Sequence, residues 1–228
     1  MDSPLVSIII PTYNGRKYLR EAIASAVEQT WSPLQVIVVD DGSTDDSAEI
    51  ARSFEGVAVI QKANGGVASA RNVGIGAANG DYLAFLDHDD VQHPQKTARQ
   101  MRVLTQTPTA GFALCHKRYV IEGEAPKWFR GPQDGTPVPG FVPSCWLVRR
   151  STFESVGVFD ERFSNGPDYD WLARAKDLGI EYEMVPDVLV DYRVHGDNES
   201  GNATAVKRDM LRLLRESLAR RRDPGGSA

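Results

Sequence analysis

The chain has 228 residues, a formal net charge of −5 and an isoelectric point near 5.4. This length suffices for one α/β domain, or at most two small ones, with a full core. The acidic balance argues against a general nucleic-acid-binding protein, and no apolar stretch approaches the roughly 20 residues that cross a bilayer.

The cysteines and the amino terminus indicate a compartment. Cys115 and Cys145 have no metal-ligand spacing and could not form a disulfide framework, so we expect reduced, structural thiols. The first residues carry no basic region, and their apolar run is too short for a signal peptide. Both observations favour a cytoplasmic protein.

The first half of the chain alternates strand and helix patterns. Short apolar runs predict buried strands at 6–10, 36–39, 57–60 and 82–86. The segments between them predict helices over 16–29, around 48–54, with Ser43 or Thr44 as cap, and over 67–78. Such an order predicts an α/β fold with right-handed crossovers and a mostly parallel central sheet with helices on both faces.

The second half is less regular. A helix is expected from His93 to about Thr105, because proline is favoured at a first helical position, and a strand at 111–120. Residues 122–143 predict a long loop that contains Trp128, Phe129 and Phe141; a substrate-facing loop and a plain connector both remain open. The remaining expected elements are a strand at 145–148, a short helix opened by a capping box at 151–154, a helix from 168 to 179, one or two strands within 181–194 broken by Pro186, and a basic amphipathic helix at 206–222 followed by a disordered tail.

Two of the expected parallel strands end in carboxylates, at Asp40–Asp41 and at Asp87–Asp90. Ligand sites in parallel sheets lie off the carboxyl ends of the strands. Carboxylates this close repel one another, and a bound cation or exposure to water relieves that repulsion. Mg²⁺ and Mn²⁺ typically bridge one or two carboxylates to a phosphate, whereas an acid at the earlier strand end suits a nucleobase or ribose. Helix capping is the alternative role, which fits Asp45 and Asp46 best.

Several motifs in order resemble glycosyltransferase family 2, which has a GT-A fold. They are Val-Ser-Ile-Ile-Ile-Pro-Thr-Tyr-Asn14, Val-Val-Asp-Asp-Gly-Ser-Thr-Asp45, Asn-Gly-Gly-Val-Ala-Ser-Ala-Arg-Asn-Val-Gly74, Asp-Tyr-Leu-Ala-Phe-Leu-Asp-His-Asp-Asp90 and Val-Gly-Val-Phe-Asp160. The match runs from about Leu5 to His195. It implies an inverting transfer of one sugar from a nucleotide-diphosphate sugar, with a UDP-sugar favoured, to an acceptor hydroxyl, assisted by Mn²⁺ or Mg²⁺.

The resemblance also implies site residues. The nucleotide-sugar-binding set that it implies is Pro11, Thr12, Tyr13, Asp41, Arg71, Asp87 and His88. Within it, Thr12, Tyr13 and Asp41 hold the nucleobase and Asp87 contacts the ribose. Asp89 and His195 are the implied metal ligands, and Asp168 is the implied general base. Asp90 is expected to be structural or to support the ligand-contacting acids from behind without touching the ligand. Asp170 is expected to be structural or acceptor-facing.

The departures from the family pattern refine this reading. Pro167 stands immediately before the implied base, where the family often has Glu. This difference concerns the local geometry of acceptor binding and not the base Asp168 itself. The Gln-X-X-Arg-Trp motif of processive synthases is absent, which favours single addition. The first strand is not followed by the G-x-G-x-x-G turn of a dehydrogenase. A non-catalytic nucleotide- or sugar-binding protein on the same fold remains the alternative.

The expected organisation is a GT-A glycosyltransferase domain over 1–205, with a nucleotide-binding part at about 1–110 and an acceptor-side part at about 111–205. The basic helix and tail follow at 206–228 and suggest weak peripheral contact with the inner face of a membrane, while a helix that packs on the domain is the alternative. The expected partners are a nucleotide-sugar donor and an acceptor that is left open among a glycan, a lipid-linked sugar, a peptide and a small molecule, without nucleic acid. The sequence does not indicate an oligomeric state.

Overall fold

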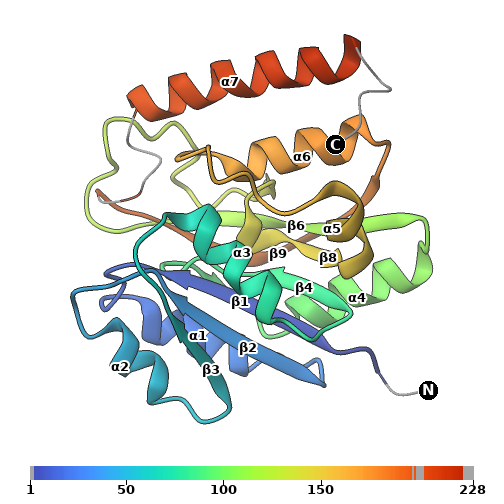
Figure 1. Cartoon of the computed structure of the whole chain (residues 1–228). Helices are drawn as coiled ribbons and strands as arrows, with labels where there is room; N and C mark the ends of the chain where they lie inside the picture. Colours follow the sequence, from blue (N-terminus) through green and yellow to red (C-terminus); the bar gives the residue numbers. More distant parts are fainter. Residues whose placement is uncertain (1–2, 197, 199–202, 223–228) are drawn as a thin grey trace.

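A central β-sheet organises the protein, as seen in a computed structural model that describes residues 3–196, 198 and 203–222 (Figure 1). The strand order is β3-β2-β1-β4-β8-β6-β9-β5, and β7 pairs with β6. The strands are β1 (Val6–Thr12), β2 (Leu34–Asp40), β3 (Val57–Gln61), β4 (Tyr82–Phe85), β5 (Val91–Gln92), β6 (Ala110–Ile121), β7 (Val138–Gly140), β8 (Leu147–Arg149) and β9 (Glu181–Val194). Strands β3, β2, β1 and β4 are mutually parallel, as are β6 and β9, while β5, β7 and β8 pair antiparallel with their neighbours.

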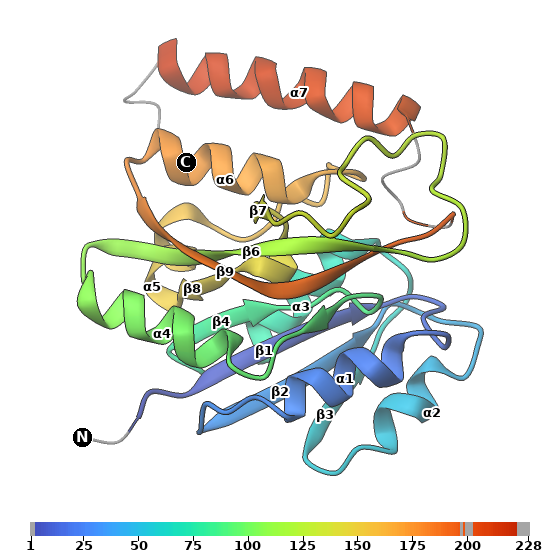
Figure 2. The same cartoon turned by 180° about the vertical axis from the view of Figure 1, so that it is seen from behind.

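Helices cover both faces of this sheet (Figures 1 and 2). They are α1 (Leu19–Val27), α2 (Ser47–Arg52), α3 (Val67–Ala77), α4 (Lys96–Gln106), α5 (Arg150–Val156), α6 (Pro167–Asp177) and α7 (Ala203–Arg222), with a 3₁₀ turn at Pro143–Cys145. Helices α1, α2 and α4 share one core cluster with the sheet, and α3, α5 and α6 share the other. Helix α7 lies over α6, at the outer edge of the molecule in both views.

The buried strand β1 shows how the sequence produces this layering. Successive side chains of a strand point to opposite faces. Ile9 packs in the cluster beneath α3, α5 and α6, while Ile8 and Ile10 pack in the cluster beneath α1, α2 and α4, and all three are fully buried. A strand covered on both faces must therefore be apolar throughout, which is the pattern that the sequence displays.

The predicted α/β class with a mostly parallel central sheet and helices on both faces is confirmed. Of the one or two strands expected within 181–194 the structure has one, β9, and the expected break at Pro186 is wrong, because β9 runs through it for 14 residues. Pro186 falls in an irregularity where the register passes from Cys115 opposite Val185 to His116 opposite Val188. A bulge leaves a residue unpaired, so the missing N–H of proline costs no ladder hydrogen bond there. Cys115 and Cys145 are buried free thiols.

Other local predictions were also wrong. Helix α4 begins at Lys96 rather than His93, after the short strand β5, and the expected loop 122–143 contains β7. Neither Ser43 nor Thr44 caps α2: the hydroxyl of Ser43 accepts from the Asn14 N–H (2.9 Å), and the Thr44 N–H donates to Asn14 Oδ1 (2.8 Å). The capping box at 151–154 is absent because the N-cap of α5 is Arg149, two residues earlier than Ser151. The tail from residue 223, expected to be disordered, lies outside the described residues.

Candidate active site

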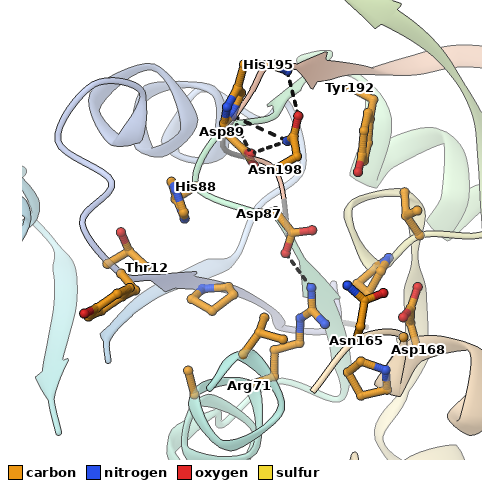
Figure 3. A pocket seen from close by; sticks show the side chains of 18 of the residues that line it. Thr12, Arg71, Asp87, His88, Asp89, Asn165, Asp168, Tyr192, His195 and Asn198 are labelled. Atoms are coloured by element: carbon orange, nitrogen blue, oxygen red, sulfur yellow. Dashed lines mark hydrogen bonds and ion pairs between the residues drawn. The ribbon is translucent and has the colours of Figure 1, made fainter. Parts of the chain in front are cut away.

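A cavity of about 890 Å³ opens at the carboxyl ends of β1, β2 and β4 (Figure 3). Each residue that the family resemblance implies lies on its wall: Pro11, Thr12, Tyr13, Asp41, Arg71, Asp87, His88, Asp89, Asp168 and His195. They come from segments up to about 180 positions apart in the sequence, and the fold brings them together. The cavity is large enough for a small-molecule ligand.

The turn after β1 is packed closely against the cavity. Thr12 is buried, and its hydroxyl oxygen has no hydrogen-bond partner among the described residues. A Cβ on Gly15 would lie 2.5 Å from Thr12 Oγ1 and 2.7 Å from the His88 ring. Only glycine therefore lets the turn, the hydroxyl and the imidazole pack this closely. A buried hydroxyl without a partner is costly, so Thr12 has a hydrogen bond to give to a ligand.

Asp41 is held by the loop that precedes α3. Its carboxylate accepts hydrogen bonds from the Gly66 N–H (2.7 Å), the Gly65 N–H (3.0 Å) and the Lys62 ammonium (2.6 Å). These donors fix the loop between β3 and α3 at the cavity wall. Asp41 thus orders the wall beside Thr12, and its own N–H donates to the Thr12 carbonyl (2.8 Å).

Asp87 forms an ion pair with Arg71 of α3. Arg71 Nη2 lies 2.6 Å from Asp87 Oδ1, and the arginine side chain is 5% exposed. Its guanidinium also lies over the Phe159 ring, 5.5 Å from the centroid. Burial on an aromatic face fixes the arginine, and the arginine in turn fixes the carboxylate in the middle of the cavity.

Asp89 contacts the end of β9. His195 Nε2 and Asn198 Nδ2 each lie 3.1 Å from Asp89 Oδ2 (Figure 3). Burial opposes ionisation of this carboxyl, but the hydrogen bond with His195 and the electrostatic influence of the neighbouring His88 and His195 side chains hold its pKa below the ordinary value. Asp89 is therefore an anion beside an imidazole.

Asp90 points away from the cavity and joins three segments. Its carboxyl group accepts from the Ser144 hydroxyl (2.6 Å) and from the Arg193 N–H (3.0 Å), and it is buried. Burial, together with the charges of Asp89 and Asp87, raises its pKa well above the ordinary value. The three adjacent acids thus have three environments, of which only Asp87 and Asp89 line the cavity.

Arg193 of β9 holds the Asp89 peptide in place, a role that no sequence pattern indicated. Its Nε donates to the Asp89 carbonyl (2.9 Å), and its two terminal nitrogens donate to Glu122 (2.7 Å) and Glu21 (2.6 Å). The guanidinium lies over the Tyr18 ring, which in turn packs 5.0 Å from the His195 ring. Arg193 therefore connects α1 and the end of β6 to the Asp89–His195 pair.

Asp168 lies in the first turn of α6, on the other side of the cavity. Gly166 precedes the helix in a left-handed conformation (φ 81°), and Pro167 occupies the first turn, where its missing N–H costs nothing. Asp168 is 8% exposed, and burial raises its pKa, while the charge of Arg71 opposes that shift. Asp170 is turned away into an ion pair with Arg174 (2.8 Å), so it is structural.

Helix α7 stabilises the loop before Asp168. The Asp209 carboxylate accepts from the Asn165 N–H (2.7 Å) and the Ser164 hydroxyl (3.1 Å), and Asn165 itself lines the cavity. No sequence signal indicated that an acid 44 positions after Asn165 would hold this loop.

The remaining wall is aromatic. Trp128 and Phe129 of the loop 122–137 line the cavity together with Tyr119 and Tyr192, whereas Phe141 is not among the lining residues. Alternation along β6 places Lys117 and Tyr119 on one face. From the sequence, alternation alone could group Lys117 with Tyr119, but it could not tell which face of β6 borders the cavity.

Asp89 and His195 could hold a divalent metal only if a bound substrate or water supplied the remaining metal ligands. Within the described residues, no group of three His, Cys, Asp or Glu side chains could hold a metal ion. Asp89 and His195 offer one oxygen and one nitrogen at 3.1 Å from each other. Mg²⁺ is usually bound by one or two carboxylates plus substrate phosphates and water, which matches this incomplete set.

In the described part of the chain, no helix is both long and apolar enough to cross a membrane.

Comparison with known proteins identifies relatives of this chain. The sequence profile described as Glycosyl transferase family 2 matches residues 7–157. An uncharacterised glycosyltransferase of Rickettsia prowazekii is 35% identical over 217 residues, which cover 88% of this chain and 67% of that protein.

Solved structures share the fold. S. aureus TarS 1–349 in complex with UDP-GlcNAc superposes with a TM-score of 0.75 and 21% identity, covering 93% of this chain and 65% of that one. The mannosyltransferase PcManGT from Pyrobaculum calidifontis, in complex with GDP-Man and Mn²⁺, gives a TM-score of 0.69 at 19% identity, covering 99% of this chain and 66% of that one. The likeness confirms the expected GT-A fold. This chain spans about two thirds of the length of each of these proteins.

Proposed function

The chain belongs to glycosyltransferase family 2, and on this basis we propose that it transfers one sugar from a nucleotide-diphosphate sugar to an acceptor hydroxyl with inversion. The observation that carries the proposal is that Asp87, Asp89 and the buried Asp168 line one and the same cavity. One side of such a cavity suits the leaving group and the other suits the attacking hydroxyl.

The donor side is proposed to lie at the ends of β1, β2 and β4, within residues 1–110. The partnerless hydroxyl of Thr12 and the wall ordered by Asp41 suit a nucleobase and ribose, with Pro11, Tyr13 and His88 beside them. The GT-A neighbour with UDP-GlcNAc supports a UDP-sugar as donor.

The metal assistance is proposed to involve Asp89 and His195, with Mn²⁺ or Mg²⁺ as the ion. The neighbour with GDP-Man and Mn²⁺ supports this choice. When bound, such an ion would neutralise the negative charge that develops on the departing diphosphate. The chain's own contribution is to keep Asp89 ionised beside His195 and to fix its peptide through Arg193.

Asp168 is proposed as the general base. It would take the proton of the acceptor hydroxyl while that oxygen attacks the anomeric carbon and the bond to the diphosphate breaks. A base works best when its pKa is close to the working pH, and burial raises the pKa of Asp168 in that direction. One displacement without a covalent enzyme intermediate inverts the anomeric centre. The absence of the Gln-X-X-Arg-Trp motif supports single addition.

We also propose weak contact of α7 with an anionic membrane surface. Its inner face is polar: Asp209, Arg212 and Arg220 bond to residues of the α6 region. Its outer face instead exposes a stripe formed by Leu211, Leu214 and Leu218, each 48–54% exposed, with Lys207 and Arg215 beside it. Met210, which is 45% exposed, lies at the border of this stripe and also lines a small cavity with Tyr169.

The charges of α7 favour a lipid surface over a second copy of the chain. Both of its acids are engaged away from the stripe, since Asp209 is buried and Glu216 pairs with Arg162. If the α7 helices of two copies packed through this stripe, their cations would repel one another. Anionic lipid instead complements an apolar stripe flanked by cations.

Vesicle co-sedimentation tests this contact. Combining Leu214→Gln with Leu218→Gln should weaken binding to anionic vesicles at least about tenfold, because each leucine loses burial in the interface. Leu178→Gln removes an equally exposed leucine at the end of α6 and should bind as the wild type does. Equal binding by the double variant would count against the membrane contact.

A nucleotide-sugar screen tests the transfer. With Mn²⁺ or Mg²⁺ present, UDP or a UDP-sugar should raise the melting temperature in a metal-dependent way and give slow donor hydrolysis. Asp89→Ala should remove the metal dependence. A protein that responds to no nucleotide would refute the proposed function.

A further inference from the structure

Lys117 is a buried cation on the cavity wall. Lys117 is 5% exposed, and its ammonium lies 3.8 Å from the Tyr192 ring centroid and 4.8 Å from that of Tyr119. Within the described residues, no carboxylate pairs with it and no hydrogen bond satisfies it. Aromatic faces compensate part of the cost of burying an ammonium, but a buried charge normally also has a counter-ion.

The other lining cations differ from Lys117. Lys17 pairs with Glu122 (2.8 Å), Arg71 pairs with Asp87 (2.6 Å), and Arg130 donates to the carbonyl of Phe129 (2.8 Å). The ammonium of Lys117 faces the cavity, where a ligand can supply the anion that the chain does not.

Lys117 belongs to the half of the cavity that holds the proposed base. Tyr192 and Asp168 lie on the same side of Asp87, away from Thr12 (Figure 3). Lys117 is within contact of Tyr192 and therefore lies in this half. The proposed nucleobase position beside Thr12 is on the opposite side.

An aromatic wall extends from this cation. Ring centroids follow one another from Trp128 to Phe129 (6.2 Å), from Phe129 to Tyr119 (4.8 Å) and from Tyr119 to Tyr192 (5.7 Å). A mostly apolar wall with one fixed charge orients a ligand that carries a single matching charge.

We propose that Lys117 binds an anionic oxygen group of the acceptor, a phosphate or a carboxylate, so that the acceptor is a negatively charged sugar or glycan. This inference rests on the proposed transfer, because that function makes the Asp168 half the acceptor side. Lys117 is then a specificity-determining residue: its ammonium donates to the anion while the aromatic wall contacts the rest of the acceptor.

Binding to the full chain saturated with UDP and Mg²⁺ tests the proposal. Titration calorimetry would compare glucose 6-phosphate and glucuronate with neutral glucose. Both anions should bind at least about tenfold more tightly than glucose, the usual effect of a charge-assisted hydrogen bond. Lys117→Met should abolish this preference. Lys127→Met removes the same charge from an exposed position in the neighbouring loop and should keep it.

Two further variants keep the test interpretable. Lys117→Arg retains the cation over the two rings and should retain the preference for anions. If Lys117→Met does not fold, Lys117→Gln takes its place and should lose the preference. Equal affinity for glucose and the two anions in the wild type, or an unchanged preference in the neutral variants, would overturn the inference.

The donor diphosphate is the other source of an anion, and nucleotide affinities distinguish it. Lys117→Met should bind UDP and UMP within about twofold of the wild type. A tenfold loss for UDP without a loss for UMP would assign Lys117 to the donor and overturn the acceptor assignment. If the wild type does not bind UDP, the proposed function itself fails; if UDP binds without any preference for anions, only this inference fails.

Discussion

Replacing Arg193 by methionine tests whether this side chain positions Asp89. Methionine keeps most of the apolar stem and removes the donors to Glu21, Glu122 and the Asp89 carbonyl. The Glu21 side chain is 63% exposed, so that ion pair contributes little. The bond to the Asp89 carbonyl and the pair with partly buried Glu122 contribute about 1 kcal/mol each.

The expected loss in the free energy of unfolding is therefore about 2 kcal/mol. For a chain of this size, that loss lowers the melting temperature by about 4–8 °C. The Asp89 peptide would also lose its fixed position beside His195, so the metal-dependent affinity for UDP should fall several-fold. Thermal unfolding and calorimetric titration with UDP and Mg²⁺ measure the two effects separately.

Arg118→Met is the matched control. Arg118 makes a two-pronged ion pair with Asp191 on the same pair of strands, but its side chain is 53% exposed. Its loss should cost at most about 1 kcal/mol and leave UDP affinity unchanged. If Arg193→Met melts and binds UDP as Arg118→Met does, the positioning role of Arg193 is refuted.

Further predictions concern the base, the pH dependence and the turn after β1. Asp168→Asn should retain nucleotide binding and lose about 10²- to 10⁴-fold in transfer rate; an unchanged rate would remove Asp168 from its proposed role. Because burial raises the pKa of Asp168, the rate should fall on acidification at a pH above the ordinary range for aspartate, which a pH profile of kcat measures. Bonds from Lys17, Tyr18 and Arg193 lower the pKa of Glu122 from 4.5 to about 2, so its stabilisation is complete above about pH 4.5 and is lost as the pH falls towards 2. Urea unfolding at a series of pH values should show this loss in the wild type, and Glu122→Gln should lack it. Gly15→Ala should weaken UDP binding and lower the melting temperature, since its Cβ would overlap Thr12 and His88; normal UDP affinity would show that this turn has room to shift.

Local patterns in the sequence were sufficient for the succession of strands and helices in the first half and for the acids at strand ends. Apolar runs separated by amphipathic segments identify buried parallel strands, because a strand covered on both faces must be apolar throughout. The carboxyl ends of such strands meet at one edge, so Asp41, Asp87 and Asp89 could be assigned to one place before any coordinates. The motif around Asp168 was found by its resemblance to the family rather than by any periodicity.

Only the tertiary structure decided which neighbours these residues have. Arg193 contacts the Asp89 peptide across 104 positions, and Asp209 holds the loop at Asn165 across 44. The burial of Lys117 between two tyrosines depends on the pairing of β6 with β9. The continuity of β9 through Pro186 likewise depends on a register irregularity against β6. Propensity and periodicity describe a residue's near neighbours in the chain, whereas these contacts arise from the packing of distant strands and helices, which no local pattern encodes.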